Sequence, residues 1–405
     1  MDLVLDLLQT IGVLSSIALI IILASRKVNF GVAILLGSLV IGITSGVTLD
    51  QAIKVLFSVF QDIATYELIL DVALIGILGF VLKETQLIQD MIQALRKILP
   101  RKALIALIPA IFGIMPMPGG ALVSAPLIDR EATELGLSPD RKTFVNLWFR
   151  HIWFFVLTIS SSLVLASRIA NINIYSLVIL QVPTFLFMTL LGSIYLIRTV
   201  KVRDSRDQGS ISFTTVILGV APILVAVVLN LIGLWLPIAL SIGILSVFLI
   251  KRGCIRSAPK TVWKGLNRGL VLATFSVMVF RSVIGETQAF NEIFVSLQQV
   301  GVPSIFFFTV FPFLLGFVAA MPTSGIAIGF SLVLPLFQNV PLSMVSLMYQ
   351  SIIIGYAISP MHLCLILTNE YYHSKIQMVY KTWGPMVLAT YAFGLLGPTL
   401  MAGFV

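Results

Sequence analysis

Charged residues are scarce in this sequence. Only 11% of its 405 residues are charged, whereas 58% are hydrophobic. Ordinary soluble domains carry charge on roughly a quarter of their residues, so the composition excludes that class. Segments without any charged residue, such as 7–24 and 213–233, reach the roughly 20 residues that cross a bilayer core. Because these runs do not alternate between polar and apolar residues, they exclude a membrane β-barrel and predict an all-α membrane protein.

Cysteine is nearly absent. The two cysteines are Cys254, in a basic loop, and Cys364, in an apolar segment. Their positions exclude a disulfide framework and give no metal-ligand spacing, so we predict no metal site, and no cofactor except a possible coupling Na⁺. Nucleophile-elbow, paired-aspartate and HExxH patterns are also lacking. We therefore predict that the protein is not an enzyme. An intramembrane enzyme that uses His151 or His362 with a nearby serine, and an anion channel, stay open as alternatives.

Acidic residues are fewer than basic ones, 17 against 26, which gives a formal net charge of +9. The basic residues cluster in loops beside apolar segments, as membrane topology requires, so we expect the lipid bilayer and not nucleic acid as a partner. The first residues lack the basic start and small-residue cleavage site of a signal peptide, so we expect the first helix to be retained.

The order of segments in the first half of the chain recurs in the second half. Pro100 and Pro303, and likewise Pro118 and Pro322, lie about half the chain apart. This recurrence indicates an internal duplication. The predicted helices are 3–25, 28–46, 51–84, 87–99, 142–168 and 174–199 in the first half, and 213–233, 234–250, 262–284, 290–300 and 343–368 in the second.

Two amphipathic segments, 87–99 and 290–300, are expected to lie in the membrane interface. The apolar residues expected to face inward on the second are Phe290, Ile293, Phe294, Leu297 and Val300. Each segment precedes an apolar stretch broken by proline and glycine. In the first, arms 103–114 and 121–128 flank the break 115–120, and in the second the break is 321–325. These arms are too short to span a bilayer singly.

The positive-inside rule indicates that both broken stretches are re-entrant hairpins. This assignment places nearly all of the 26 basic residues on one side of the membrane. It gives about ten transmembrane helices plus two hairpins, five crossings per half, and therefore two repeats of inverted topology. The amino and carboxyl termini are both predicted outside. Inverted repeats with broken helices are typical of secondary transporters.

The hairpin tips, and breaks predicted at 158–162 and 358–362, supply the candidate site. Broken backbone inside a membrane must be buried in protein or line a cavity, where freed N–H groups favour an anion and freed carbonyls a cation. The predicted substrate-binding residues are Pro118, Gly119, Gly120, Ser124, Pro322, Thr323, Ser324, Ser160, Ser161, Ser359 and His362. The predicted cation-binding residues are Met117, Gly119, Ser162, Thr323 and Ser359.

Ionisable residues within the membrane segments are a second class of candidates. We expect Asp71, near the outer face, to be solvated. Arg150 and His151 lie close to the cytoplasmic end of their helix, where an arginine can extend to the surface. His362, beside Pro360, is a candidate for substrate binding or proton sensing. Because no carboxylate lies near the breaks, coupling by Na⁺ held on carbonyls and hydroxyls is favoured over a carboxylate proton relay.

The order of these parts resembles the ion transporter superfamily of citrate, gluconate and dicarboxylate carriers over nearly the whole chain. Three motifs, Met115–Pro126, Trp148–Trp153 and Ile358–Leu365, resemble a prokaryotic family of integral membrane proteins of unassigned function. Sodium-dicarboxylate members share Ser-Asn-Thr at both hairpin tips, whereas this chain has Pro-Gly-Gly and Pro-Thr-Ser. The substrate class is therefore left as a small organic anion of the carboxylate type.

The superfamily resemblance implies an elevator transporter, coupled to Na⁺ or H⁺, that forms a homodimer in the prokaryotic inner membrane. The resemblance also implies that the chain is divided into a scaffold, interfacial arms and a mobile transport body. Scaffold helices are expected at 1–86 and 213–285, arms at 87–100 and 286–301, hairpins and transport helices at 101–199 and 302–405, and a cytoplasmic linker at 200–212.

Overall fold

The computed structural model describes residues 2–26, 28–114, 120–200, 213–287 and 290–401. These residues form helices and loops without a strand, which confirms the predicted all-α class. The helices of the first half are α1 (Asp2–Ser25), α2 (Phe30–Thr44), α3 (Leu49–Gln61), α4 (Ile63–Glu84), α5 (Leu87–Ile98), α6 (Arg101–Ile114), α7 (Gly120–Glu134), α8 (Pro139–His151), the 3₁₀ turn η1 (Ile152–Phe155), α9 (Ser161–Ala170) and α10 (Ile174–Thr199).

The second half continues in the same order, with two further 3₁₀ turns. Its helices are α11 (Phe213–Leu231), α12 (Leu236–Ile250), η2 (Arg252–Ser257), α13 (Ala258–Gly265), α14 (Arg268–Thr287), α15 (Asn291–Gln299), α16 (Ile305–Phe308), α17 (Val310–Ala319), α18 (Pro322–Val333), η3 (Leu334–Leu336), α19 (Leu342–Ile358), α20 (Leu363–Tyr372) and α21 (Ile376–Met401).

Side-chain caps divide two segments that were predicted as single helices. The expected helix 51–84 is two helices, because Asp62 ends α3 and its carboxylate accepts a hydrogen bond from the backbone N–H of Ala64, which starts α4. The expected helix 262–284 is likewise divided at Asn267, whose side chain accepts from the N–H of Leu270. Both predictions were wrong because an apolar run does not reveal where a short side chain replaces a helical hydrogen bond.

Several helices have the length and composition of membrane spans. Within the described residues, five are long and apolar enough to cross a bilayer, counting α19 and α20 as one broken span. Shorter apolar helices, among them α2, α9 and α12, accompany them. Large hydrophobic side chains such as Leu39, Ile43 and Leu190 are more than half exposed, as expected for surfaces that face lipid. The chain is therefore a multi-pass membrane protein.

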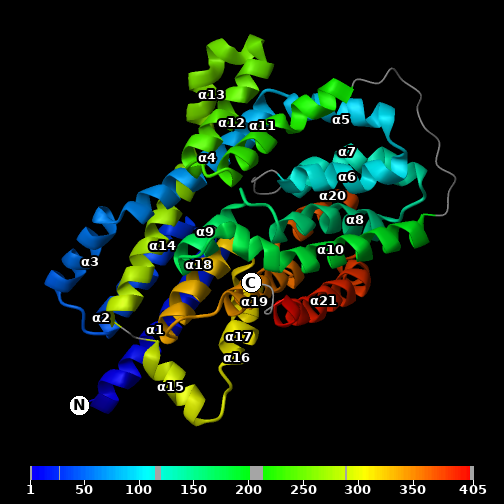
Figure 1. Ribbon diagram of the computed structural model, residues 1–405. Helices are drawn as coiled ribbons and strands as arrows, with labels where there is room; N and C mark the ends of the chain where they lie inside the picture. The colour runs from blue at the N-terminus through cyan, green and yellow to red at the C-terminus, as the bar shows by residue number, and fades with distance from the viewer. Residues whose placement is uncertain (1, 27, 115–119, 201–212, 288–289, 402–405) are drawn as a thin grey trace.

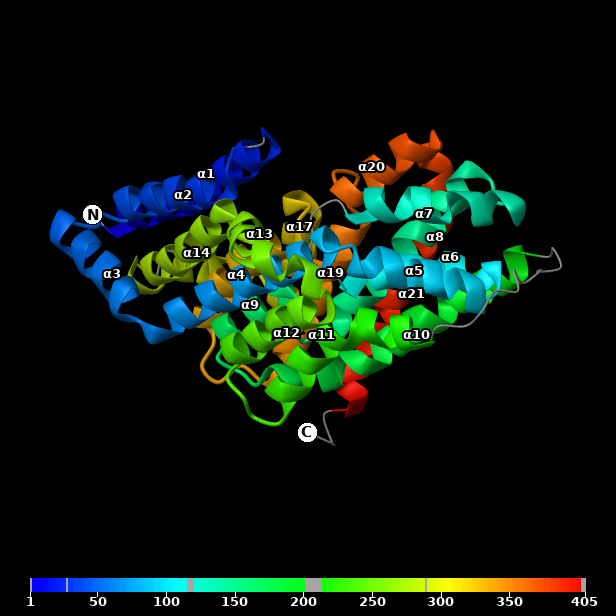
Figure 2. The same ribbon diagram turned by 90° about the horizontal axis from the view of Figure 1, so that it is seen from above.

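The helices are arranged in two lobes (Figures 1 and 2). One lobe holds α1–α4 and α11–α14. Its contacts cross between the halves of the chain, since α2 packs against α14, α4 packs against α12, α3 packs against α14 and α13 packs against α4. Within each half, α1 packs on α2 and α11 packs on α12. The same set of contacts is therefore made twice, once from each half.

The other lobe holds the two helical hairpins and the broken helices. Hairpin one is α6 and α7, and hairpin two is α17 and α18. The first arm of each packs against the next long helix of its own half, α6 on α8 and α17 on α19. The second arm packs against the other half, α7 on α20 and α18 on α9. Helices α10 and α21 lie side by side at the edge of this lobe (Figures 1 and 2).

Two glycines permit the close approach of each first arm to its neighbour. A Cβ added to Gly113 of α6 would lie 2.2 Å from the carbonyl oxygen of Arg150 in α8. A Cβ added to Gly316 of α17 would lie 2.1 Å from the carbonyl oxygen of Ile352 in α19. Small residues at helix crossings let backbones pack closely in membranes. These two contacts occupy the same place in the two halves.

The two predicted amphipathic segments are the helices α5 and α15. The apolar face of α5, including Ile88, Met91 and Leu95, is buried by protein, against α11 and α4. At α15, the N-terminal cap Phe290 is buried and Phe294 packs edge-to-face on Phe307, but the C-terminal cap Val300 is 84% exposed. The prediction that Val300 faces inward was wrong, because the helix ends at Gln299 and the following turn directs it outward. The side chain of Ile293 is not among those that the structure describes.

One ion pair connects α5 to hairpin one, and a second joins the two helices of that hairpin. Arg96 of α5 lies 3.1 Å from Glu131, and Arg101 lies 2.8 Å from Glu134, both on α7. Arg130 also donates a hydrogen bond to Glu134 and lowers the pKa of that carboxyl from its ordinary value.

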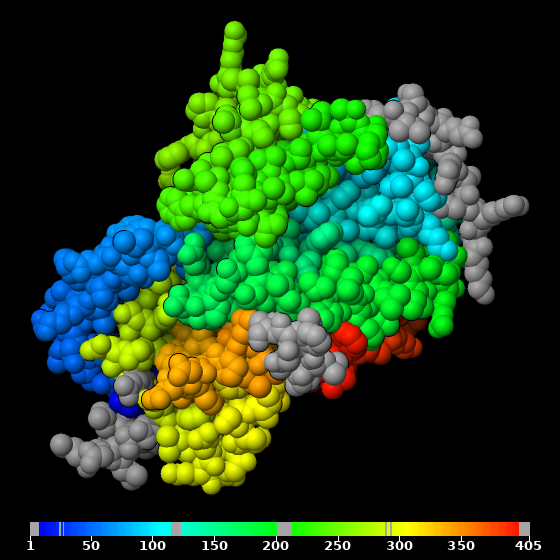
Figure 3. All heavy atoms as spheres, viewed as in Figure 1, coloured from blue at the N-terminus to red at the C-terminus, as the bar shows by residue number. Residues whose placement is uncertain are grey.

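Elsewhere on the surface, α3 and α13 protrude from the body of the molecule (Figure 3).

Candidate functional site

The first helix break lies between α8 and α9. After His151 the chain makes the turn η1 and then extended or turn backbone before α9 starts at Ser161, so the break begins earlier than the predicted 158–162. The hydroxyl of Tyr349, on α19, donates to the Phe154 carbonyl at 2.5 Å. The Ser162 hydroxyl lies 3.2 Å from the same Tyr349 hydroxyl and 2.7 Å from that of Ser160. A side chain from the other half thus satisfies a carbonyl that the break frees.

The predicted second break, between α19 and α20, is confirmed at residues 359–362. Two side chains of α21 hold the carbonyls at its start. Trp383 Nε1 donates to the Ala357 carbonyl at 2.9 Å, and the Tyr380 hydroxyl donates to the Ile358 carbonyl at 2.8 Å. Ser359 is buried, and its hydroxyl accepts from the Met361 N–H at 3.3 Å. These partners satisfy two carbonyls and one N–H group of the proline-broken backbone.

Hairpin two turns at Ala320, which has a left-handed conformation with φ of 50°, and α18 starts at Pro322. Pro322 is buried, Thr323 is half-buried, and Ser324 is 2% exposed. The Ser324 hydroxyl has no hydrogen-bond partner within the described part of the chain. Buried hydroxyls are nearly always paired, so this group has the character expected of a ligand-binding donor or acceptor.

The tip of hairpin one lies mostly outside the described residues. The predicted ligands Met117, Pro118 and Gly119 fall there, and Gly120 is the first residue of α7. Ser124 is described, and its hydroxyl donates to Asn146 Oδ1 of α8 at 2.7 Å. Asn146 Nδ2 in turn lies 2.9 Å from the Ala121 carbonyl and 3.3 Å from the Thr368 hydroxyl of α20. One buried amide therefore joins hairpin one to the second broken helix.

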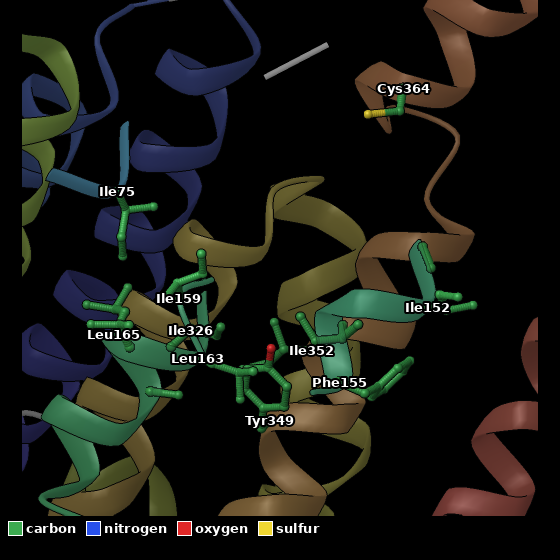
Figure 4. Packing of buried hydrophobic residues seen from close by; sticks show 14 of the residues in the cluster. Ile75, Ile152, Phe155, Ile159, Leu163, Leu165, Ile326, Tyr349, Ile352 and Cys364 are labelled. Atoms are coloured by element: carbon green, nitrogen blue, oxygen red, sulfur yellow. The ribbon is translucent and has the colours of Figure 1, made fainter. Parts of the chain in front are cut away.

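The predicted site residues divide into two groups. Ser160 precedes α9, and Ser161 and Ser162 begin it. Helix α9 packs against α18 of hairpin two, the helix that carries Thr323 and Ser324. Figure 4 shows the contact, with Ile159 and Leu163 beside Ile326 and the Tyr349 ring. Ser359 and His362 lie at the break before α20, which packs against α7 of hairpin one. Each break therefore meets the hairpin of the opposite half.

Side chains that the sequence did not connect meet at the second break. The Nε2 atoms of His151 and His362 lie 3.0 Å apart. One ring nitrogen of each histidine and the Cys364 sulfur all lie within 4.8 Å of one another. The sequence offered no metal-ligand spacing at Cys364, and His362 was weighed as an isolated histidine. His362 is not isolated, because the contact forms across the fold between residues about half the chain apart. The His-x-Cys spacing of His362 and Cys364 was the one local signal.

Arg150 does not extend to the surface as expected. It is 7% exposed, and Nη1 donates to the Phe112 carbonyl at the end of α6, at 2.5 Å. The reason is the close packing of α6 on α8, which places the freed carbonyls of α6 within reach of this side chain. Arg150 thus holds hairpin one near its tip.

Asp71 is also placed differently from the prediction. It was expected to be solvated, but it is 0% exposed because α9 packs over this part of α4. Arg168 of α9 lies 3.1 Å from Asp71 Oδ2 and 2.6 Å from Glu67 Oε2. This ion pair is the polar contact that joins the two lobes at α4 and α9.

A cavity of about 620 Å³ lies beside this ion pair. It is bounded by residues of α3, α4, α9 and α14 and by Asn171, and two of its lining side chains, Arg168 and Arg281, are cationic. Its other polar lining residues are Ser58, Asp62, Thr65, Asn171, Ser282 and Glu286. The cavity is large enough for a small metabolite and lies between the lobes.

Comparison with known proteins identifies the family of the chain and a solved structure of similar fold. Residues 8–397 match the family described as "Protein of unknown function (DUF401)". None of the curated proteins compared matches the chain. Among solved structures, the fold is similar to the crystal structure of the Alcanivorax borkumensis YdaH transporter, with 14% sequence identity, a TM-score of 0.57, and coverage of 88% of this chain and 90% of that one. A likeness at this identity shows a shared fold.

Proposed function

The chain belongs to the DUF401 family of proteins of unknown function, and from its site geometry we propose that it is a secondary active transporter of a small organic anion. The observation that carries this proposal is that the second arm of each hairpin packs against the broken helix of the opposite half of the chain. Helix α18 of hairpin two packs on α9, and α7 of hairpin one packs on α20. Broken helices paired with hairpins in this way are typical of carriers with alternating access. The similar fold of a protein titled a transporter supports the same function.

We propose further that the two sets of helices are inverted repeats and that the protein works as an elevator. The lobe of α1–α4 and α11–α14 would be the scaffold, and it would dimerise in the prokaryotic inner membrane, with both termini outside. An exposed apolar face of α3 supports dimerisation. Its residues are Leu49, Ile53, Leu56, Phe57 and Phe60. The mass of the purified complex would distinguish a dimer from a monomer.

The transported species follows from the charges and freed groups near the site. The N-terminus of α18, with Pro322 as its first residue, directs backbone N–H groups at the hairpin tip, where a carboxylate is stabilised. Arg168 and Arg281 place two guanidinium groups at the cavity between the lobes, beside the carboxylates of Asp62 and Glu286, and either guanidinium could donate hydrogen bonds to a bound carboxylate. The hydroxyls of buried Ser162 and half-buried Ser160 and Ser161 at the first break are suitable ligands for Na⁺, with H⁺ as the alternative coupling ion.

The proposal is tested by reconstituting the purified protein in liposomes. Radiolabelled small carboxylates are offered with an imposed Na⁺ gradient, an imposed H⁺ gradient, or neither. We expect one gradient to drive accumulation of at least one carboxylate above equilibrium. Flux that runs only down its own gradient, far faster than a carrier turns over, would instead support an anion channel. Chemical conversion of the solute without accumulation would support the enzyme alternative.

A substitution at the tip of hairpin two separates binding from folding. For Ser324→Ala we expect the KM for the transported anion or coupling ion to rise by about tenfold, the effect of losing about 1.4 kcal/mol of binding, roughly one hydrogen bond to a charged group. The melting temperature should stay the same or rise, because a buried unpaired hydroxyl is removed.

Ser331→Ala is the matched control, since Ser331 lies on the same helix and its buried hydroxyl also has no hydrogen-bond partner among the described residues. It lies two turns farther from the tip, so its KM should be unchanged. Equal KM values for both variants and the unaltered protein would remove Ser324 from the site.

A further inference from the structure

The His151, His362 and Cys364 cluster has a composition that packing alone does not explain. The chain has three histidines and two cysteines, and three of these five side chains meet at the second break. Their exposed fractions are 2%, 0% and 7%. Burying imidazole groups away from water is costly unless their polar atoms are paired. Within the described residues, His362 Nδ1 has no hydrogen-bond partner.

The distances in the cluster suit a metal ion. A tetrahedral ion with Zn–N bonds of about 2.0–2.1 Å and a Zn–S bond of about 2.3 Å holds its ligand atoms roughly 3.3–3.7 Å apart. Here the two Nε2 atoms are 3.0 Å apart, and the three ligand atoms lie within 4.8 Å of one another. The imidazole planes are nearly perpendicular, at 85°. Shifts of a few tenths of an ångström to about 1 Å would bring all three atoms onto one ion.

The tautomer of His151 is fixed in the form that a metal requires. Its Nδ1 lies 2.6 Å from the Leu147 carbonyl, which can only accept, so Nδ1 carries the proton. The lone pair of Nε2 then faces His362. Metal-binding histidines are commonly oriented in this way, by a hydrogen bond from the other ring nitrogen to a carbonyl. The aromatic rings of Tyr356 and Trp383 hold His151 further, at centroid distances of 5.9 Å each.

The ligand set defines the class of ion. Two imidazole nitrogens and a thiolate favour Zn²⁺ or Cu⁺ over Na⁺, Mg²⁺ or Ca²⁺, which prefer oxygen ligands. No carboxylate belongs to the group found among the described residues. The Tyr356 hydroxyl lies 3.4 Å from His151 Nε2 and is the nearest candidate for a fourth ligand. Because Arg150 adds a buried positive charge next to His151, Cu⁺ with a thiolate leaves less uncompensated charge than Zn²⁺ does.

We propose that His151, His362 and Cys364 bind one thiophilic metal ion, Cu⁺ or Zn²⁺, which fastens α8 to the second helix break. The ion joins residues from the two halves of the chain at a place where the backbone leaves its helix. It is separate from the Ser324 tip of hairpin two, and the proposal holds whether or not the protein transports an anion.

The test is metal binding by the full chain purified in detergent and stripped with a chelator. Cu⁺ is titrated in competition with a chromophoric chelator, and Zn²⁺ is titrated separately with a fluorescent one. We expect one ion per chain, with affinity reduced at least tenfold in His362→Ala and in Cys364→Ser. His373→Asn and Cys254→Ser are the matched controls, because they remove the histidine and the cysteine outside the cluster, and their affinity should be unchanged.

A second measurement tests the proposal without altering the cluster, in case the His362 and Cys364 variants fail to fold. In the Cys254→Ser protein, Cys364 is the single thiol, and its reaction with a maleimide should slow at least tenfold when the metal is added and recover with chelator. Binding of less than one-tenth of an ion per chain, equal affinity in Cys364→Ser and the unaltered protein, or labelling unaffected by metal would each overturn the proposal. The two histidines would then be a hydrogen-bonded pair without an ion.

Discussion

Replacement of Arg168 by methionine is expected to lower the free energy of unfolding by about 3 kcal/mol. Arg168 contacts Glu67 and Asp71, and Asp71 is fully buried with one oxygen, Oδ1, that has no hydrogen-bond partner in the described structure. Removing the guanidinium leaves this carboxylate inside the protein without its counter-charge. The cost is measured as the shift in thermal or denaturant unfolding of the protein in detergent micelles.

The paired substitution Arg168→Met with Asp71→Asn should recover most of this loss, because the fully buried carboxylate is replaced by a neutral amide and Glu67, whose side chain is 25% exposed, keeps access to water. The control is Lys54→Met. Lys54 pairs with Asp50 at 2.7 Å, but both side chains are 74% exposed, so its loss should change stability by less than about 0.5 kcal/mol. Equal effects of Arg168→Met and Lys54→Met would show that the pair between the lobes contributes no more than a surface pair.

The same ion pair bears on the elevator proposal. Arg168 lies on α9 and Asp71 on α4, so the bond joins the proposed transport body to the proposed scaffold. A body that slides along the scaffold has to break this contact or carry it to new partners in each cycle. In the doubly substituted protein, flux in liposomes should therefore change while the fold is retained.

Replacement of Trp383 by alanine is expected to be even more destabilising, by about 4 kcal/mol. The Trp383 side chain is fully buried and packs edge-on against Trp148 and His151. Its Nε1 also donates to the Ala357 carbonyl where α19 ends. Alanine leaves both a large cavity and an unpaired carbonyl at the second break. The measurement is again the unfolding transition in micelles, together with near-ultraviolet circular dichroism.

Two further variants separate the causes of this loss. Trp383→Phe keeps most of the ring volume but loses the hydrogen bond, so it should cost about 1–2 kcal/mol, the expense of an unsatisfied buried carbonyl. Trp263→Ala is the control, because Trp263 is 65% exposed and its removal should cost less than about 0.5 kcal/mol. A Trp383→Phe variant as unstable as Trp383→Ala would assign the whole effect to the hydrogen bond.

Much of the fold could be predicted from local patterns. The helix predicted at 174–199 has those bounds in α10, and the amphipathic segment at 87–99 is α5. Pro360 correctly indicated the second break, because a proline removes a donor that a continuous helix needs. The divisions at Asp62 and Asn267 were missed, because a hydropathy value averaged over a window of residues does not reveal a single capping side chain. The first break was placed several residues late, because serines mark only its end and the turn η1 has an apolar sequence.

The candidate site was predicted less completely. The serines of the first break and of hairpin two were predicted to bind substrate or cation. The structure packs their helices, α9 and α18, together, and the binding itself stays a prediction. Asp71 and Arg150 were expected near water because their positions along single helices lie close to helix ends. Both are buried by helices from elsewhere in the chain, and both make charge-assisted hydrogen bonds there.

The sequence by itself determined the class of the protein and the order of its parts. A scarcity of charge requires lipid as the solvent, lipid requires helices, and two proline-broken segments half a chain apart require polar or buried surroundings for their freed backbone groups. Only the tertiary structure decided which residues meet. Long-range contacts depend on helix packing and rotation, which hydropathy does not encode. For this reason His151, His362 and Cys364, ordinary as separate residues, became a cluster only when the two halves packed together.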